Sequence, residues 1–461
     1  MQATTLKQIA DWCDGTLIQG RPADTIASLS TDSRKLAGGE LFLALKGERF
    51  DGHRFIQEAG DAGVAAIVVS DLPLSSESFT GGIVHVSDTL TALQHLALRY
   101  RRSRPDLFVV GLTGSNGKTS TKDFLSAVLT KSGKVNATPG NLNNHIGLPQ
   151  TILKTEADDE IGVWEMGMNH PGEIEVLAEI AAPDAAVITN VGTAHIEHMK
   201  TREAIAEEKG MLAEAVGPDG FVVLNANDEY TDSIRGRCRA RVITAGIDTG
   251  DVVASDLKPT AAGMAFVLSA AGESVEVSLP VPGAHMVANA VLAAAVGLER
   301  GLSLLAVADA LSEARLSGGR LQRREAGGIE FLDDSYNANP DSMRAALATL
   351  AAMETQGRRI AVLGRMAELG EHEEREHIAL GEAAVAAGID TLIAVGEAGK
   401  LILEGAGEKG GAILWAADHE AAATQLVGVV APGDIVLVKG SRSSGMEKVI
   451  EAFGERESQT N

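Results

Sequence analysis

The residues with the clearest chemical potential form one turn: Gly114, Ser115, Asn116, Gly117, Lys118, Thr119 and Ser120. An apolar run at 107–112 precedes the turn and is typical of a buried strand, and the apolar positions within 121–129 have helical spacing. A strand, a glycine turn and a helix in this order form a phosphate cradle, because backbone N–H groups and the helix N-terminus face one anion. Lys118 would reach the β- and γ-phosphates, and the Thr119 hydroxyl group would hold Mg²⁺.

The turn differs from the strict Walker A pattern at one position. That pattern has its first glycine where this chain has Leu112. An ordinary strand–turn–helix corner is therefore the alternative interpretation. The Gly-Lys-Thr string at the start of the expected helix favours the phosphate cradle, and on this ground we predict a nucleotide site.

Polar residues with catalytic potential follow other apolar runs, which indicate parallel strands buried on both faces. Glu165 follows the run 161–164, and His195 lies in the loop after 185–190. Ligands of open parallel sheets bind beyond the carboxyl ends of the strands, so such side chains belong to a binding region. A carboxylate there can bind Mg²⁺. The alternatives are a solvated acid for Glu165 and a role without metal for His195, which spacing alone does not separate from a ligand role.

Lys209 is expected to face the protein interior. In the helix predicted over 201–212, Ile205, Lys209 and Leu212 lie on one apolar stripe. An inward lysine loses hydration, which lowers the pKa of its ammonium group. The neutral amine can react with CO₂ to give a carbamate, which is an anion that binds metal. The alternative is a lysine whose stem is buried and whose charged end reaches water, and the residues alone favour it.

Two further turns combine many hydrogen-bonding groups. The segment 333–340 follows a strand, precedes a helix, and carries carboxylates, amides, a hydroxyl group and a phenol. A helix N-cap at Asn339 or Asp341 explains only one of these groups. The segment 439–445 is a second strand–turn–helix corner that suits an anion. Both segments are candidate parts of a binding site.

Composition limits the function classes. The chain has 461 residues, with 63 acidic against 40 basic ones and a net charge of −23, so we expect several domains and no nucleic-acid partner. Two cysteines without a Cys-x-x-Cys string support neither a disulfide framework nor a cysteine zinc site. The first residues lack the apolar core of a signal peptide, and no apolar stretch approaches the ~20 residues of a transmembrane helix. We therefore expect a cytoplasmic protein.

The expected fold class is α/β with three domains. Residues 1–88 form the first domain, 89–315 a central parallel-sheet P-loop domain, and 316–461 a C-terminal doubly wound, Rossmann-like domain. In the last domain strand-like runs alternate with helical segments, and the Gly-x-Gly-x-x-Gly string of a dinucleotide site is missing.

Eight strings in sequence order resemble the Mur ligase family, the ATP-dependent amide-forming ligases of peptidoglycan precursor synthesis. They are Thr-Asp-Ser-Arg at 31–34, Gly-Ser-Asn-Gly-Lys-Thr at 114–119, Gly-Asn-Leu-Asn-Asn at 140–144, Glu-Met-Gly at 165–167, Asn-Val-Gly-Thr-Ala-His at 190–195, Pro-Gly-Ala-His-Met-Val-Ala-Asn at 282–289, Asp-Asp-Ser-Tyr-Asn-Ala-Asn-Pro at 333–340 and Lys-Gly-Ser-Arg at 439–442. The resemblance covers nearly the whole chain and implies ATP and Mg²⁺ as cofactors.

The resemblance implies roles for individual residues. The positions that would hold the UDP part of the substrate are Ser33, Arg34, Lys46 and Gly47. The positions that match Mg²⁺ ligands are Thr119, Glu165, His195 and, as a carbamate, Lys209; the last three and Lys118 would be catalytic. ATP contacts beyond the phosphate turn match Asn289, Arg320 and Asp334. The remaining predicted substrate contacts are Asn144, Tyr336, Asn337 and Asn339.

Within the family, the strings are most similar to those of ligases that join D-alanyl-D-alanine to UDP-N-acetylmuramoyl-tripeptide. The resemblance implies these two substrates and an acyl-phosphate intermediate, and we expect a monomer. Transfer of the γ-phosphoryl group turns an inert carboxylate into an acyl phosphate, and Lys118 and Mg²⁺ would disperse the charge. The amine of the dipeptide then attacks, and closure of the C-terminal domain keeps water out.

Two positions depart from this pattern, and three alternative functions stay open. The segment Gly318-Gly319-Arg320 lacks the proline found in many relatives. Arg365 stands where ligases with these substrates usually have aspartate. The sister ligase that adds the third amino acid usually carries Asp-Asn-Pro-Arg, which is absent here. Folylpolyglutamate synthase generally lacks the UDP-binding part that the first domain would supply. A P-loop switch would hydrolyse nucleotide without needing an amine.

Overall fold

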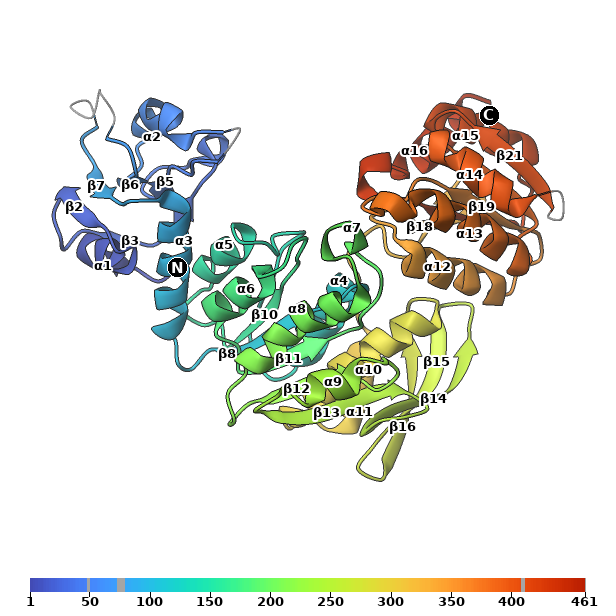
Figure 1. Cartoon of the computed structure of the whole chain (residues 1–461), viewed down its shortest axis with the longest axis horizontal. Coiled ribbons are helices and arrows are strands. Elements are labelled where there is room, and N and C mark those ends of the chain that lie inside the picture. Colours follow the sequence, from blue (N-terminus) through green and yellow to red (C-terminus); the bar gives the residue numbers. More distant parts are fainter. Residues whose placement is uncertain (48–49, 73–78, 408–410, 461) are drawn as a thin grey trace.

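The chain folds into three α/β domains, each built around its own main sheet, which confirms the expected fold class. The computed structural model describes residues 1–460 except 48–49, 73–78 and 408–410. Figure 1 shows the N-terminal and C-terminal domains at opposite ends of the central domain. Among the helices of the described chain, none is long and apolar enough to cross a membrane.

The N-terminal domain is a five-stranded sheet in the order β2-β7-β6-β5-β4, parallel except at β2. Helices α1 and α3 cover one face and α2 covers the other. Helix α3 also packs on α5 and α6 of the central domain, so it joins the two domains. The bounds are β1 (Thr4–Thr5), α1 (Leu6–Trp12), β2 (Thr16–Gln19), β3 (Thr25–Ile26), β4 (Leu29–Ser30), β5 (Leu41–Leu43), α2 (Ile56–Asp61), β6 (Ala66–Val69), β7 (Gly82–His85) and α3 (Thr89–Arg102).

The central domain holds a nine-stranded sheet in the order β16-β15-β14-β13-β12-β11-β8-β10-β9. Helices α4, α10 and α11 cover one face, and α5, α6 and α8 cover the other. The strands are β8 (Phe108–Thr113), β9 (Val135–Ala137), β10 (Ile161–Glu165), β11 (Ala185–Ile188), β12 (Phe221–Asn225), β13 (Arg241–Ile247), β14 (Val252–Pro259), β15 (Met264–Ala270) and β16 (Glu273–Leu279). The helices are α4 (Lys118–Leu129), α5 (Gly147–Leu153), α6 (Glu173–Ala181), α7 (Ile196–Met199), α8 (Arg202–Ala215), α9 (Thr231–Arg235), α10 (Ala284–Glu299) and α11 (Leu304–Ser312).

The expectation of a parallel sheet is right for β8–β14 and wrong for the last strands, because β14, β15 and β16 pair antiparallel. Their side chains alternate between buried and exposed, as at Met264, Phe266 and Leu268 of β15. Such alternation is the signature of a sheet with one wet face, in contrast to the continuous apolar runs of β8 and β11. Strands β14, β15 and β16 extend the sheet away from β8 and α4, which flank the phosphate turn (Figure 1).

The C-terminal domain is a six-stranded sheet in the order β17-β18-β22-β19-β20-β21, parallel except at β17. Helices α12, α13 and α14 pack on one face, and α15 and α16 on the other, which confirms the doubly wound arrangement. The bounds are β17 (Gln322–Ala326), β18 (Ile329–Asp334), α12 (Pro340–Ala352), β19 (Arg359–Leu363), α13 (Glu373–Ala386), β20 (Thr391–Val395), α14 (Glu397–Ala406), β21 (Ala412–Ala416), α15 (His419–Val429), β22 (Ile435–Lys439) and α16 (Glu447–Thr460).

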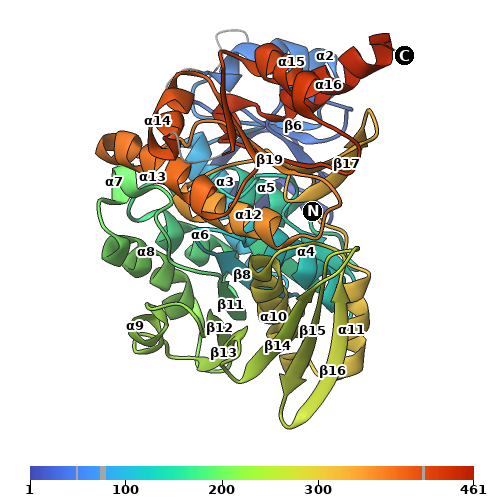
Figure 2. The ribbon, with the colours of Figure 1, turned by 90° about the vertical axis from the view of Figure 1, so that its right-hand side faces the viewer.

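Helix α12 begins with strong local signals, and Figure 2 shows it at the side of the C-terminal domain that faces the central domain. Asn339 is the N-cap, its side chain accepts the Ser342 N–H, and the Ser342 hydroxyl group accepts the Asn339 N–H. Pro340 occupies the first turn, where its missing N–H costs nothing. The predicted stripe that includes Met343 and Leu347 is buried. The sequence therefore fixes where this helix starts and which face it buries.

Helices α13 and α14 approach each other through glycines, which gives a stability prediction. A Cβ atom at Gly405 would lie 1.8 Å from the Ile378 carbonyl oxygen, whereas one at Gly428 on α15 would meet nothing within 4 Å. We expect Gly405→Ala to lower the free energy of unfolding by about 1–3 kcal/mol through overpacking. Gly428→Ala should leave it unchanged or raise it by up to about 1 kcal/mol. Chemical denaturation of both variants tests this; equal effects would contradict the close approach of the two helices.

Candidate active site

A cavity of about 1280 Å³ lies between the central and C-terminal domains. It brings together most of the residues predicted from the sequence: Ser115, Asn116, Gly117, Lys118, Thr119, Ser120, Asn144, Glu165, His195, Asn289, Arg320, Asp334, Tyr336, Asn337 and Asn339. Gly114 and Lys209 lie behind this lining. The four residues predicted in the N-terminal domain do not line the cavity.

The phosphate turn links β8 to α4 and depends on two glycines. Gly117 has a φ of 79°, and a Cβ atom there would lie 2.3 Å from the Asn289 side-chain oxygen. A Cβ atom at Gly114 would lie 1.8 Å from the Thr189 hydroxyl oxygen. Both positions therefore exclude a side chain, and the first also favours glycine by its backbone conformation. The turn has the shape that a phosphate cradle requires.

Lys118 folds back over this turn. Its Nζ donates a hydrogen bond of 2.8 Å to the Gly114 carbonyl oxygen. Burial lowers the pKa of the Lys118 ammonium group, and the Glu165 carboxylate opposes that shift. An anion in the cradle would offer this cation a stronger partner than a carbonyl oxygen does.

Thr119 and Glu165 form a buried pair at the end of β10. The Thr119 hydroxyl group donates a hydrogen bond of 2.8 Å to Glu165 Oε2, and Asn143 Nδ2 donates one of 2.8 Å to Oε1. Glu165 is only 2% exposed, so it is not the solvated acid that the sequence left possible. The Arg320 guanidinium group donates to the same Thr119 hydroxyl group at 3.0 Å, from the connection to the C-terminal domain. Hydroxyl and carboxylate oxygens are suitable Mg²⁺ ligands, and the two groups fit such an ion.

His195 faces the C-terminal domain. Its Nδ1 lies 2.6 Å from Glu368 Oε2, and Glu368 comes from the loop after β19. Burial lowers the pKa of the His195 imidazole, which the Glu368 carboxylate opposes. The hydrogen bond to His195 lowers the pKa of the Glu368 carboxyl group. Figure 2 shows α7, which begins next to His195, beside the start of α13. One imidazole nitrogen of His195 is therefore bonded to a carboxylate of the C-terminal domain.

Lys209 is buried in α8, as predicted, with 1% of its surface exposed. Within the described chain its ammonium group makes no hydrogen bond or ion pair. Burial lowers the pKa of Lys209 well below its usual value, and the charge of Lys118 lowers it further. Glu208 opposes the shift, but its carboxylate accepts the N–H groups of Gly172 and Ile174 at the start of α6. The amine is thus buried near the cation Lys118, and no carboxylate of the described chain is bonded to it.

The two polar turns of the C-terminal domain meet at an ion pair. Lys439 Nζ lies 2.6 Å from Asp334 Oδ2 and donates to the Asn337 carbonyl oxygen at 3.0 Å. The Tyr336 ring lies between two guanidinium groups, with Arg320 4.0 Å and Arg442 5.8 Å from its centroid. The two turns, far apart in sequence, therefore form one wall of the cavity.

The N-terminal candidates lie apart from this cavity. Arg34 pairs with Asp32 through bonds of 2.8 and 2.9 Å, and Lys46 lies 2.7 Å from Asp71. Ser33 and Gly47 flank these pairs. The turn that holds Arg34 is tied to the central domain by a bond of 2.9 Å from the Gln150 side chain to Thr31.

Several cavity residues were not predicted as site residues. Asn143 binds Glu165, Glu368 binds His195, and Asp341 binds Thr193. The first lies in the string at 140–144, so a signal was present in the sequence. The other two meet the central domain only through the arrangement of domains. Arg365 lies outside the cavity lining, where Glu373 holds its guanidinium group through bonds of 2.7 and 3.0 Å.

Comparisons with known proteins decide the family. Models described as "Mur ligase family, catalytic domain", "Mur ligase middle domain" and "Mur ligase, glutamate ligase domain" match residues 25–101, 112–297 and 319–442. The UDP-N-acetylmuramoyl-tripeptide--D-alanyl-D-alanine ligase of Escherichia coli (strain K12) is 38% identical, with 99% of each chain covered. The chain belongs to the Mur ligase family. The resemblance seen in the eight strings is confirmed.

Solved structures agree with this placement. This Mur ligase is similar to MurF from Acinetobacter baumannii, with a TM-score of 0.91, 32% identity and 99% of each chain covered. It is also similar to the MurF ligase from Thermotoga maritima in complex with ADP, with a TM-score of 0.84, 31% identity, and 94% of this chain and 98% of that one covered. The three-domain Mur ligase fold therefore extends over the full described chain.

Burial of Lys209 gives a prediction with a definite sign in pH. An amine with a lowered pKa in the folded chain binds fewer protons there than in the unfolded chain, so the folded state is penalised below the usual pKa of 10.5. We expect Lys209→Met to raise the free energy of unfolding by about 1–3 kcal/mol at about pH 7. The gain should shrink as the pH rises towards 10.5, where the unfolded amine also loses its proton.

The measurement is denaturant unfolding of both proteins in CO₂-free buffer at about pH 7 and about pH 10. Lys400→Met is the control, because Lys400 is exposed and pairs with Glu397, and it should change stability by less than about 0.5 kcal/mol. Equal or lower stability of Lys209→Met at the lower pH would contradict the unpaired, buried amine.

Proposed function

We propose that this Mur ligase joins D-alanyl-D-alanine to UDP-N-acetylmuramoyl-tripeptide with consumption of ATP, in peptidoglycan precursor synthesis. The observation that carries the proposal is the Thr119–Glu165 pair beside the phosphate turn, at a cavity shared by two domains. The relative in Escherichia coli that bears this activity in its name matches the whole length of the chain, which supports the choice of substrates.

ATP would place its phosphates in the turn at 114–120. The N-terminus of α4 and the backbone N–H groups face the anion there, and Lys118 would leave the Gly114 carbonyl oxygen for the phosphate oxygens. The Asn289 side chain lies against Gly117 of the turn, and Asn289 is the proposed contact for the nucleotide base. Arg320 and Asp334 would contact the nucleotide from the C-terminal domain.

Thr119, Glu165 and His195 would hold Mg²⁺, with Lys209 as a carbamate behind them. When bound, the ion would neutralise phosphate charge during transfer. The carbamate forms when the neutral Lys209 nitrogen bonds to the carbon of CO₂ and loses a proton. The lowered pKa of Lys209 favours the neutral amine that this step requires. The new anion would lie near the cation Lys118, whose charge favours it.

The chemistry follows from the needs of amide synthesis. An oxygen of the tripeptide carboxylate attacks the γ-phosphorus, the bond to the β-γ bridging oxygen breaks, and ADP leaves. Lys118 disperses the charge on the transferred group. The amine of D-alanyl-D-alanine then attacks the acyl carbon, the C–O bond to phosphate breaks, and the amine proton is lost. The wall formed by Tyr336, Arg320 and Arg442 would exclude water from the acyl phosphate.

The predicted domain limits become part of this proposal. Residues 1–88 would bind UDP through Ser33, Arg34, Lys46 and Gly47, with 89–315 binding ATP and 316–461 closing the site. Asn144, Tyr336, Asn337 and Asn339 would contact the rest of the substrate. We also propose that the enzyme is a monomer and that it lies in the cytoplasm, where ATP is available.

Phosphate release is the test of the reaction. We expect release from ATP and Mg²⁺ to require both UDP-N-acetylmuramoyl-tripeptide and D-alanyl-D-alanine. Lys118→Ala should lower turnover by at least about a hundred-fold, because it removes the cation at the transferred group. Folate with glutamate, and UDP-muramoyl-dipeptide with a diamino acid, are the substrate controls. Release that ignores the dipeptide would support the nucleotide switch instead, and preference for a control pair would support the corresponding ligase.

Chemical rescue tests the carbamate. Lys209→Ala should lower turnover by at least about tenfold, because a metal-binding group is lost. Added acetate should restore part of the activity, since the shortened side chain leaves room for a carboxylate. Lys209→Met is the matched control, because its side chain fills that room and acetate should not help. Full activity of Lys209→Ala, or equal rescue of both variants, would refute the carbamate.

A further inference from the structure

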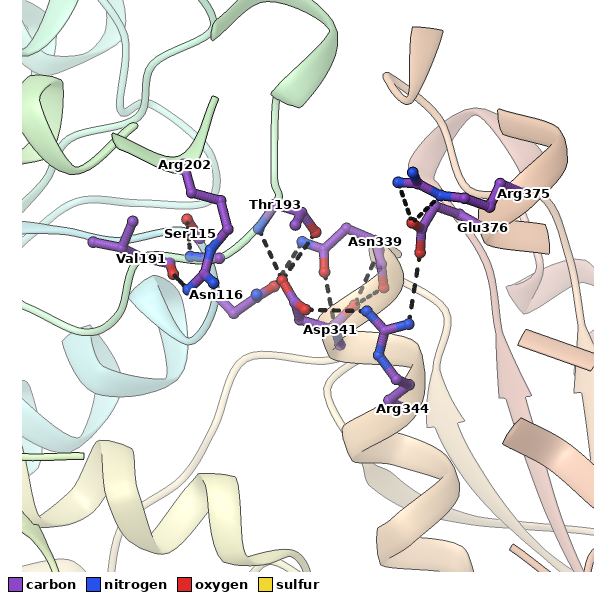
Figure 3. A network of polar contacts seen from close by, with 12 residues as sticks. Ser115, Asn116, Val191, Thr193, Arg202, Asn339, Asp341, Arg344, Arg375 and Glu376 are labelled. Atoms are coloured by element: carbon purple, nitrogen blue, oxygen red, sulfur yellow. Dashed lines mark hydrogen bonds and ion pairs between the residues drawn. The ribbon is translucent and has the colours of Figure 1, made fainter. Parts of the chain in front are cut away.

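The start of α12 contacts two loops of the central domain. Asp341 Oδ2 accepts the Thr193 N–H at 2.8 Å and the Thr193 hydroxyl group at 3.0 Å. Asn339 Nδ2 donates a hydrogen bond of 2.7 Å to Asn116 Oδ1, within the phosphate turn (Figure 3). We call these bonds, made by Asn339 and Asp341, the α12 contact. The mechanism above assigns no role to Asp341 or Thr193.

The central-domain side of the α12 contact is held firmly. The Asn190 side chain accepts the Asn116 N–H at 2.9 Å, and the Gly192 N–H donates to the Ser115 hydroxyl group at 2.8 Å. The Val191 carbonyl oxygen accepts from the Arg202 guanidinium group at 2.9 Å (Figure 3). The phosphate turn and the loop that carries Thr193 are therefore joined by hydrogen bonds, so a displacement of one loop shifts the other.

The C-terminal side is also braced. The Arg344 guanidinium group lies 3.3 Å from Asp341 Oδ1 and 3.6 Å from Glu376 on α13 (Figure 3). Gly192 leaves the room that Asp341 needs, because a Cβ atom there would lie 2.4 Å from Asp341 Oδ2. Both sides of the contact are thus shaped for this pair.

We propose that Asp341 and Thr193 are positioning residues that hold the C-terminal domain against the loops around the phosphate turn in the closed arrangement of the two domains. Through Asn116 and the hydrogen-bonded loops, the α12 contact sets the distance between the phosphate turn and the cavity wall that contains Arg320 and Tyr336. Each bond of the α12 contact stabilises this closed arrangement, so a nucleotide that contacts both domains binds more tightly. The inference rests on the proposed function only for its kinetic readout.

Small-angle X-ray scattering with saturating ADP and Mg²⁺ tests the structural part. Wild-type scattering should match the curve calculated from this structure, and Asp341→Ala should increase the radius of gyration. Asp341→Asn keeps an acceptor oxygen for Thr193 and should stay close to wild type. Glu397→Ala is the matched control, because Glu397 also lies in the first turn of a helix and pairs three residues on, with Lys400, without touching the central domain. Scattering of Asp341→Ala that equals wild type, or that Glu397→Ala reproduces, would overturn the proposal.

Kinetics test the coupling to nucleotide. Asp341→Ala should raise the KM for ATP about fivefold, as the loss of a bonded pair at a half-buried site does, with a smaller effect on kcat. Thr193→Val should raise it less, and the double variant should be no worse than Asp341→Ala, because the two residues share their bonds. Fully additive effects would overturn the pairing. If scattering changes as expected but the wild type shows no dipeptide-dependent phosphate release, the proposed function fails and the α12 contact stands.

Discussion

Three parts of the chain meet at the hydroxyl group of Thr119. It lies on the first turn of α4, donates to Glu165 at the end of β10, and accepts from Arg320 in the connection to the C-terminal domain. A hydroxyl group has one proton to donate, so the hydrogen bond to Glu165 fixes the orientation of the Thr119 O–H bond and leaves the oxygen lone pairs as acceptors. These bonds orient the phosphate turn, the Glu165 carboxylate and the C-terminal domain relative to one another. A movement of the C-terminal domain therefore shifts groups at the turn.

Burial affects the two charged groups Glu165 and Lys209 differently, because only Glu165 has hydrogen-bonding partners in the described chain. Glu165 is almost fully buried and has donors on both carboxylate oxygens, so its negative charge is satisfied. Lys209 is equally buried and lacks such a partner, although an unpaired buried charge is costly. A fold that keeps this buried amine loses stability at a position where the proposed carbamate chemistry needs a neutral nitrogen, which is the pattern of a functional site.

Local sequence signals predict the parts of the fold that local physics determines. The apolar runs before Glu165 and Asp334 are strands, and the stripe that places Lys209 inside α8 is real. Strands β14–β16 were not predicted because their alternating pattern differs from the continuous runs of the parallel core. Edge strand β17 is exposed along most of its length and carries little apolar signal.

Contacts between domains are beyond the reach of such signals. Glu368 meets His195, and Asp341 meets Thr193, only because the C-terminal sheet sits over the central one. Nothing in the spacing of these residues encodes that placement. The resemblance to the Mur ligases supplied the proposed roles of Thr119 and His195, whereas their hydrogen-bonding partners are seen only in the structure. Sequence motifs therefore predict which residues belong to the candidate site, but they do not predict which side chains of another domain those residues contact.

The central claim is that the phosphate turn energises a carboxylate, and oxygen tracing tests it most directly. The terminal carboxylate of the tripeptide substrate is labelled with ¹⁸O at both oxygens, and the released phosphate is analysed by mass spectrometry after turnover with ATP and D-alanyl-D-alanine. An acyl phosphate requires one labelled oxygen in each phosphate, with the other retained in the new amide. Phosphate free of label would contradict the account, because the carboxylate would then never have bonded to phosphorus.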